Sequence, residues 1–240
     1  MNTQNFKQRF RFTLKAIDAK LGIRKWLWSD NLKDRPGAFL AGDRGIEWAW
    51  VVSHLPPCKA EILDIGGNYS PLGTIAAMLG HQVTIIDMNP LPFAFSGVKV
   101  MVGDFLKAVF RKQKFDCIIV CSTIEHFGLA WRYGSSNDPE GDLRGMVHIQ
   151  KLLKPNGTVL LTIPVGVDAC LCPWHRIYGR IRLPALLNGF RIVKECYYAK
   201  SDRKIWREVD KEAALSFEGS VAIYALGLFV LNVTGAKKHI

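Results

Sequence analysis

Short apolar runs separated by turns and helical segments recur along the middle of the chain. Five of them have the length and the bounding residues of buried or half-buried β-strands, and they lie within the stretches 61–70, 83–87, 98–105, 115–126 and 152–164. Residues 75–79 predict a short helix that Gly80 closes. A later apolar run, 221–230, is too short to cross a bilayer and is expected to be the last core strand. This alternation predicts an α/β fold.

Acidic residues stand at the ends of three of these predicted strands. Asp64 comes two residues before a turn that begins Gly66-Gly67. Asp87 ends the second strand, and Asp104 follows the third. Doubly wound folds bind ligands at the carboxyl ends of their strands, where a carboxylate placed like Asp87 accepts from ribose hydroxyls. The turn lacks the later glycines of the dinucleotide-binding pattern G-x-G-x-x-G, which disfavours that class of cofactor.

The stretch from Asp64 to Ser70 resembles the first motif of the class I S-adenosylmethionine-dependent methyltransferases, D-x-G-x-G-x-G. Asn68 and Ser70 replace its second and third glycines, and asparagine is the non-glycine residue that best tolerates a left-handed backbone. Later segments resemble further motifs of this family in the expected order, at 83–87, 98–105, 115–126 and 152–164. The resemblance implies an α/β, doubly wound, seven-stranded and mostly parallel sheet, a Rossmann-like methyltransferase fold whose last strand is antiparallel.

The same resemblance implies S-adenosylmethionine as the cofactor, bound at the carboxyl edge of the sheet. Asp64 and the glycine turn are expected near its methionine part, Asp87 on the ribose, and Asp104 with Phe105 by the adenine. The residues expected to contact the cofactor are Asp64, Gly66, Gly67, Asn68, Asp87, Met88, Asp104, Phe105 and Ser122.

The second half of the chain resembles a poorly characterised methyltransferase-like family that often accompanies bacterial surface-polysaccharide genes. The residues that carry this resemblance lie at 125–129, 132–134, 138–143, 164–166 and 175–184. The association favours a hydroxyl of a sugar, glycan or other small molecule as the methyl acceptor, with a phosphorylated acceptor as one version of this hypothesis.

Methyl transfer to a hydroxyl is helped by a base that removes the proton of the acceptor. His126 is the first candidate, because it follows the fourth strand at the ligand-binding edge and an imidazole can be uncharged near neutral pH. Glu125 is expected to orient His126 or to contact the cofactor. His175 is the second candidate for the base. For both histidines, capping of a neighbouring helix is the structural alternative.

Length and composition agree with one methyltransferase domain over residues 45–240, preceded by a basic helical extension over residues 1–44. The chain has 240 residues, of which 49% are hydrophobic, so it can bury a full core without disulfides. Its six cysteines include no C-x-x-C pair, and reduced thiols in a cytoplasmic protein are expected. Cys170 and Cys172 lie near His175, but the spacing suits zinc poorly and a fourth ligand is not apparent, so no metal is expected.

The net charge of +11 is concentrated in two flanking segments. Residues 1–35 contain nine basic and three acidic residues, and residues 174–211 contain ten basic and four acidic residues. This distribution predicts a polyanionic partner, which is anionic lipid, nucleic acid or a phosphorylated substrate. Arg132, Arg176 and Arg182 are candidates for holding a phosphate or carboxylate, with solvated surface arginines as the commoner alternative.

The first residues of the chain have the pattern of an amphipathic helix. Apolar side chains recur at helical spacing over residues 6–21, and an aromatic cluster follows at 26–28. We expect this helix to pack on the domain, and the alternative is peripheral contact with an anionic membrane at its inner face. No secretory signal is visible, which agrees with a cytoplasmic location.

Two other functions stay open besides a small-molecule or glycan O-methyltransferase. An RNA methyltransferase would use the basic flanks, but residues 122–125 differ from the N-P-P-Y-like string that is typical of enzymes methylating exocyclic base nitrogens. A protein with the cofactor fold but without catalysis is compatible with Asn68 and Ser70. The three acids at the strand ends disfavour it, and the O-methyltransferase is the preferred hypothesis.

Overall fold

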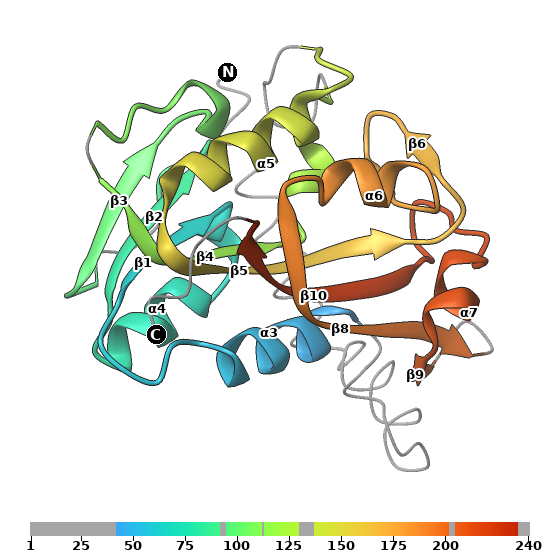
Figure 1. Cartoon of the computed structure of the whole chain (residues 1–240), viewed down its shortest axis with the longest axis horizontal. Helices are drawn as coiled ribbons and strands as arrows, with labels where there is room; N and C mark the ends of the chain where they lie inside the picture. Colours follow the sequence, from blue (N-terminus) through green and yellow to red (C-terminus); the bar gives the residue numbers. More distant parts are fainter. Residues whose placement is uncertain (1–41, 92–94, 112, 130–136, 202–204, 235–240) are drawn as a thin grey trace, which may run out of the picture. The chain divides into compact units, whose positions relative to one another are not determined.

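The helices and strands of a computed structural model follow one another in the expected α/β order (Figure 1). The structure describes residues 42–91, 95–111, 113–129, 137–201 and 205–234. Its strands are β1 (Glu61–Ile65), β2 (Gln82–Asp87), β3 (Val98–Val102), β4 (Phe115–Cys121), β5 (Leu153–Val165), β6 (Ala169–Leu171), β7 (His175–Ile177), β8 (Phe190–Ser201), β9 (Ile205–Val209) and β10 (Ala225–Val233). Its α-helices are α3 (Arg44–Ser53), α4 (Leu72–Met78), α5 (Gly141–Leu152), α6 (Arg182–Leu186) and α7 (Lys211–Leu215), and its 3-10 helices are η2 (Gly67–Tyr69), η3 (Phe105–Lys107) and η4 (Ile124–His126).

Most of the expected N-terminal extension lies outside the described residues. These include the amphipathic pattern over residues 6–21 and the aromatic cluster at 26–28, so their packing and membrane alternatives stay predictions. Helix α3 begins at Arg44, next to the domain boundary expected after residue 44. In the described part of the chain, no helix has both the length and the apolar character that crossing a membrane requires.

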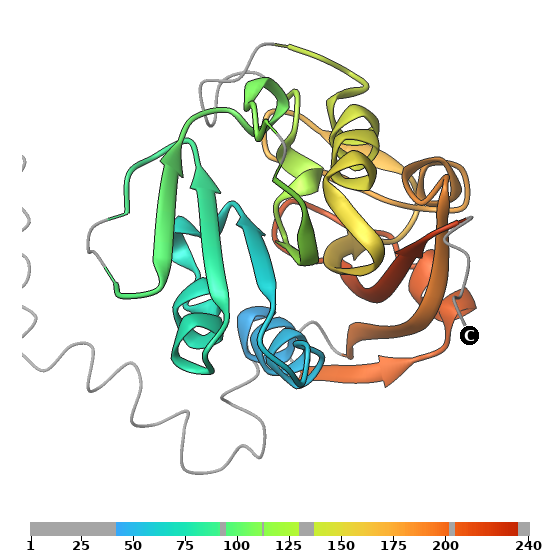
Figure 2. The same ribbon diagram turned by 60° about the vertical axis from the view of Figure 1, so that its left-hand side comes forward.

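Within the described residues the main sheet runs β3-β2-β1-β4-β5-β10-β8-β9. The first five of these strands pair in parallel, while β10 pairs antiparallel with both β5 and β8. Figure 2 shows β2 and β3 at one end of this sheet and β8, β9 and β10 toward the other. The doubly wound sheet and the antiparallel last strand beside β8 are therefore confirmed.

The seven strands expected from the sequence become eight in the described residues, because β9 extends the edge of the sheet beyond β8. Its five residues pair antiparallel with the end of β8, from Tyr197↔Val209 to Ser201↔Ile205. Trp206 is the one buried side chain of this strand, while Ile205 and Arg207 are exposed. A strand that buries so little gives a sequence pattern that is hard to distinguish from a loop.

Helices cover both faces of the sheet. Helices α5 and α6 lie on one face, and α3 and α4 lie on the other (Figure 1). The central strands β1 and β4 are buried on both faces, which explains why they are continuous apolar runs in the sequence. Strand β3 has helical cover on part of its surface only, and Val100 and Val102 are exposed there.

A buried carboxylate on α5 anchors the segment that carries β7 and α6. The side chain of Asp142 is completely buried. Its Oδ2 accepts from the Tyr178 hydroxyl at 3.0 Å and from Arg182 Nε at 2.9 Å, and its Oδ1 accepts from Arg182 Nη2 at 2.6 Å. Arg176 Nε lies 3.7 Å from Asp142 Oδ2. Two guanidinium groups and one hydroxyl therefore converge on a single carboxylate.

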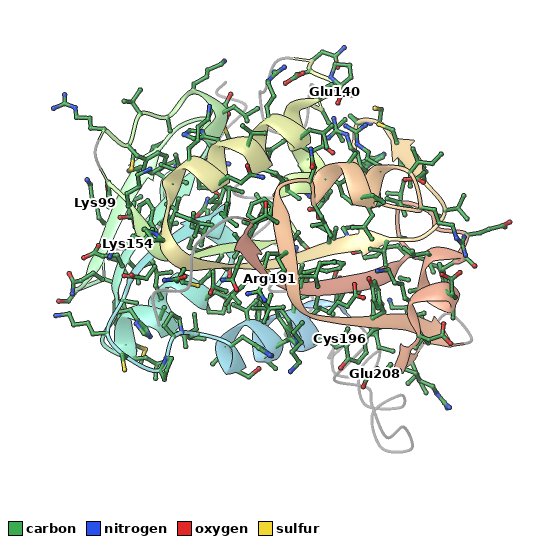
Figure 3. All side chains as sticks on the ribbon, in the orientation of Figure 1. Lys99, Glu140, Lys154, Arg191, Cys196 and Glu208 are labelled. Atoms are coloured by element: carbon green, nitrogen blue, oxygen red, sulfur yellow. The ribbon has the colours of Figure 1, made fainter. Side chains whose placement is uncertain are left out.

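Arg176 also connects this carboxylate to two loops. Its guanidinium is buried and donates to the backbone carbonyls of residues 125, 127, 138 and 139. Arg182 makes a further contact of 3.7 Å to Glu140, which Figure 3 labels at the start of α5. The expectation that Arg176 and Arg182 bind a phosphate or carboxylate ligand is thus corrected, because protein groups occupy their donors. Arg132 lies outside the described residues.

Replacing Asp142 with alanine should lower the free energy of unfolding by about 3–5 kcal/mol, since it leaves buried cationic groups without their counter-charge. Urea unfolding measures this loss. The matched control is Glu212→Ala, which removes the exposed Arg180–Glu212 ion pair and should cost less than about 1 kcal/mol. Similar losses in both variants would contradict the anchoring role of Asp142.

Candidate functional site

A pocket of about 210 Å³ opens at the carboxyl ends of β1, β2 and β4. This is the edge where doubly wound sheets bind ligands. Six of the residues expected to contact a cofactor line it, namely Gly66, Asp87, Met88, Asp104, Phe105 and Ser122, and so does the candidate base His126. The other expected site residues do not line it, namely Asp64, Gly67, Asn68, Glu125 and His175.

The turn after β1 brings the backbone close to two neighbouring side chains. Gly66 has a φ of 77°, and a Cβ atom there would lie 2.5 Å from Thr123 Cγ2. A Cβ atom on Gly67 would lie 2.6 Å from Asp64 Oδ2. Both positions therefore require glycine, the first for its conformation and its space and the second for its space.

Asp64 lies beneath this turn instead of facing the pocket. Burial raises the pKa of its carboxyl to about 7, the Gly73 N–H opposes this rise, and the charge of Asp87 adds to it. The Oδ2 atom of Asp64 lies close under the Gly67 backbone, where an added Cβ atom would be 2.6 Å away.

Asp87 ends β2 and lines the pocket with its carboxylate. Its Oδ2 accepts from the Asn68 N–H at 3.2 Å, and its Oδ1 accepts from the Asn89 N–H at 2.9 Å. A carboxylate has about four acceptor positions, so two remain for a ligand. Asp87 therefore both fixes the turn after β1 and keeps acceptors for hydroxyl groups.

Asp104 and Phe105 form the wall of the pocket after β3. Asp104 caps η3, where its Oδ1 accepts from the Leu106 N–H at 2.9 Å. The ring of Phe105 is largely buried and stacks on His148 with centroids 4.7 Å apart. Contact with His148 on one side orients this ring at the edge of the pocket.

Ser122 adopts an unusual backbone conformation where the chain leaves β4. Its φ of 44° lies in the left-handed region, which is costly for a residue with a side chain. Its N–H donates to the carbonyl and the hydroxyl oxygens of Thr162 at 3.0 and 3.1 Å. Its hydroxyl donates to Glu47 Oε1 in a short contact. These bonds hold the backbone in a shape that exposes it to the pocket.

Helix α3 supplies pocket residues that the sequence analysis missed. Arg44 and Trp48 line the pocket. Glu47 between them is fully buried, and it accepts from Arg44 Nη1 at 2.9 Å and from the Thr162 hydroxyl at 2.6 Å. Burial raises the pKa of Glu47, and the Arg44 charge opposes that rise. The sequence does contain a sign that Glu47 is buried. Glu47 lies three residues before Trp50, so the two side chains share one face of the helix.

His126 faces the pocket with its orientation set by a backbone carbonyl. Its Nδ1 lies 2.6 Å from the Trp174 carbonyl oxygen. A carbonyl can only accept, so Nδ1 carries a proton and the neutral ring keeps the lone pair of Nε2. Nε2 lies 3.7 Å from Glu125 Oε1.

Behind His126 lies a group of buried titratable side chains. Burial raises the pKa of Glu125 to about 8, its own backbone N–H opposes this rise, and the Glu47 charge adds to it. The His175 ring packs edge-on against His126 and Tyr224, with centroids 6.4 and 5.3 Å apart. The structure thus brings His126, Glu125 and His175 together, but of the three only His126 lines the pocket.

In the part of the chain that the structure describes, no three His, Cys, Asp or Glu side chains form a cluster that could hold a metal ion. Cys170 and Cys172 are both exposed on the β6–β7 hairpin.

Sequence comparisons connect part of the chain to a family without a known function. Residues 98–216 match the model of a family described as Caenorhabditis protein of unknown function, DUF268. No curated protein sequence matches the chain.

Solved structures of methyltransferases share the fold at low sequence identity. The 1,6-didemethyltoxoflavin-N1-methyltransferase of Burkholderia thailandensis, with bound 1,6-didemethyltoxoflavin and S-adenosylhomocysteine, is 15% identical, with a TM-score of 0.55 over 97% of this chain and 91% of that chain. The N-methyltransferase NodS from Bradyrhizobium japonicum WM9 is 15% identical, with a TM-score of 0.55 over 80% of this chain and 96% of that chain. NodS in complex with S-adenosylhomocysteine is 16% identical, with a TM-score of 0.52 over 85% of this chain and 91% of that chain. The Rossmann-like methyltransferase fold expected from the sequence is therefore confirmed.

The raised pKa of Glu125 has a consequence for stability that depends on pH. Between about pH 4.5 and pH 8 the folded protein keeps a proton that the unfolded chain releases, so the contribution of this group to stability is lost as the pH rises toward 8. Glu125→Gln imitates the protonated carboxyl. The free energy of unfolding of Glu125→Gln minus that of wild type should increase by up to a few kcal/mol from pH 5 to pH 8. Urea unfolding at several pH values tests this, and a constant difference would contradict it.

Proposed function

We propose that the protein transfers a methyl group from S-adenosylmethionine to a hydroxyl acceptor in this pocket. The observation that carries the proposal is the convergence of the glycine turn after β1, Asp87 and Asp104 on one pocket at the carboxyl edge of the sheet. The confirmed fold supports the same conclusion. Bound S-adenosylmethionine supplies an electrophilic methyl group on a sulfonium centre.

The residues of the pocket fit such a cofactor. The two acceptor positions left on Asp87 suit the hydroxyls of a ribose. The Gly66 backbone passes close enough to the pocket to lie against the methionine part. Asp104 presents a carboxylate to the adenine ring of the cofactor, and Phe105 presents the edge of an aromatic cluster. Ser122 and Met88 complete the set proposed to contact the cofactor, while Asn68 acts through the backbone N–H that it donates to Asp87.

Arg44 and Trp48 add two donors to this set. Arg44 is held by Glu47. Burial lowers the pKa of the Arg44 guanidinium, but the charges of Glu47 and Asp43 raise it. The indole Nε1 of Trp48 is buried and has no hydrogen-bond partner among the described residues. We propose that these donors hold the carboxylate of the methionine part, because a buried donor without a partner is costly unless a ligand satisfies it.

The acceptor proton is assigned to His126. The Trp174 carbonyl holds the ring in the form whose Nε2 can accept a proton. After that transfer the imidazolium would lie 3.7 Å from Glu125, whose carboxylate form would stabilise it. The His175 ring packs against His126 and is itself backed by Tyr224, so His175 acts as a positioning residue in this proposal. Glu125 has the same role.

A sugar, glycan or other small molecule is the proposed acceptor class. The alternative RNA substrate has less support from the structure, because several basic residues of the segment 174–211 are engaged in internal ion pairs. These residues are Arg176, Arg180, Arg182 and Lys211. Contact of the N-terminal segment with an anionic membrane and a cytoplasmic location remain proposals from the sequence.

Replacing Asp87 with alanine should weaken the binding of S-adenosylhomocysteine by about 1.5–3 kcal/mol, which is the usual contribution of a hydrogen bond to a charged group. Isothermal titration calorimetry measures the affinity. Asp116→Asn is the matched control, because Asp116 lies at the amino end of β4 and should leave the affinity unchanged. Unchanged binding in Asp87→Ala, or tighter binding of NAD than of S-adenosylhomocysteine by wild type, would contradict the proposed site.

Replacing His126 with alanine should lower the single-turnover rate of methyl transfer by about 10²–10⁴ and keep the affinity for S-adenosylhomocysteine. The rate is measured with isotopically labelled S-adenosylmethionine and an acceptor found by screening sugars, nucleotide sugars and other small hydroxyl compounds. His54→Gln, outside the pocket, is the control and should keep the wild-type rate. A near-normal rate in His126→Ala would remove this residue from the mechanism, and a larger loss in His175→Ala would reverse the assignment of the two histidines.

A further inference from the structure

The β6–β7 hairpin carries two thiols whose sulfur atoms are in contact. Cys170 Sγ and Cys172 Sγ are 3.0 Å apart, and both residues are exposed. A disulfide bond is about 2.05 Å long, so only a small local movement separates the two thiols from a covalent bond. The other four cysteines have no comparable sulfur partner among the described residues, and Cys117 and Cys121 are buried in β4.

We propose that Cys170 and Cys172 form a reversible dithiol–disulfide site that reacts with low-molecular-weight disulfides and whose oxidation moves the turn holding His126. This inference goes beyond methyl transfer and does not rest on it. The oxidant is a small disulfide such as oxidised glutathione, which the reaction reduces to two thiols.

The reaction takes place in two exchange steps. The thiolate of one cysteine of the pair attacks the small disulfide, which forms a mixed disulfide and releases one small thiolate. The thiolate of the other cysteine then attacks the protein sulfur of this mixed disulfide, which closes the protein disulfide and releases the second small thiolate. The two protein thiols lose two protons and two electrons, and the small disulfide gains them.

Nearby groups act on the reactivity of the pair. Burial raises the pKa of Cys170, the hydrogen bond to Cys172 adds to the rise, and Arg176 and Arg182 oppose it. The two sulfur atoms share a hydrogen bond in which either thiol can be the donor. Whichever thiol reacts first, the other lies within reach of the mixed disulfide that forms.

The turn after Cys172 connects the thiols to the pocket. The N–H of Trp174 donates to the Leu171 carbonyl at 2.7 Å, and the Trp174 carbonyl accepts from His126 Nδ1 at 2.6 Å. The hairpin register places Leu171 opposite His175 and Cys170 opposite Arg176. A covalent bond between residues 170 and 172 constrains the start of this turn, so it shifts the carbonyl that orients His126.

Mass spectrometry of the full-length protein in glutathione buffers tests the site. Wild type, Cys170→Ser and Cys172→Ser are equilibrated in mixtures of reduced and oxidised glutathione, quenched with acid and mapped by peptide. Wild type should lose two hydrogens in the peptide that contains the pair, and dithiothreitol should restore them. Each serine variant should instead retain glutathione on the remaining cysteine of the pair. Cys58→Ser is the matched control, because Cys58 is exposed without a neighbouring thiol, and it should keep the wild-type behaviour of the pair.

Two results would overturn the proposal. The first is wild type that keeps both thiols free, or retains glutathione on them, in a buffer that oxidises small dithiols. The second concerns the connection to the pocket and is measured by ¹⁵N NMR of the histidine rings, in which the His126 signals are assigned by their loss in His126→Gln. These signals should move when wild type is oxidised and stay in place when Cys172→Ser is treated in the same way. Unmoved His126 signals in an oxidised wild type would overturn the connection to the pocket.

Discussion

The buried carboxyl of Glu47 joins the three elements on which the pocket depends. It accepts from the hydroxyl of Ser122, which follows β4, from the hydroxyl of Thr162 within β5, and from the guanidinium of Arg44 on its own helix. Ser122 is held in a left-handed conformation that costs about 1–3 kcal/mol. These bonds offset that cost, because each buried donor would otherwise lose its partner. One carboxyl therefore attaches α3 to the sheet and fixes the backbone that passes behind the ligand site.

A second set of buried polar groups supports the same edge from the other side. Asp142 and Arg176 connect α5 to the carbonyls of the chain on both sides of His126. The β6–β7 hairpin adds the Trp174 carbonyl, which selects the form of the His126 ring. The His126 ring itself is thus oriented by a backbone carbonyl at 2.6 Å, while the carboxyl of Glu125 lies farther away, at 3.7 Å. A neutral carbonyl fixes the ring without adding a charge beside it, which suits the proposed role of His126 as a base.

Several residues with the appearance of ligand-binding groups serve the architecture instead. Arg176 and Arg182 have the fork geometry that binds phosphate, yet Asp142 and backbone carbonyls occupy their donors. Asp64 has the sequence position of a cofactor ligand, yet its carboxyl lies under the glycine turn. The residues left to face a ligand are therefore fewer than the sequence pattern suggests. They include Arg44 and Trp48, which stand outside every motif.

Local sequence patterns were enough to predict the sheet, the glycine turn and most of the acids at its edge. Apolar runs on β1 and β4 and the acid before Gly66 depend on local pattern, and neighbouring residues are enough to specify them. Strand β9 was not predicted, because Trp206 is its only buried side chain. The roles of Glu47, Asp142 and the Trp174 carbonyl were decided by tertiary structure alone, since each bonds to residues far away in the chain. A sequence shows which side chains are polar, but only the fold decides whether a protein group or the pocket receives their hydrogen bonds.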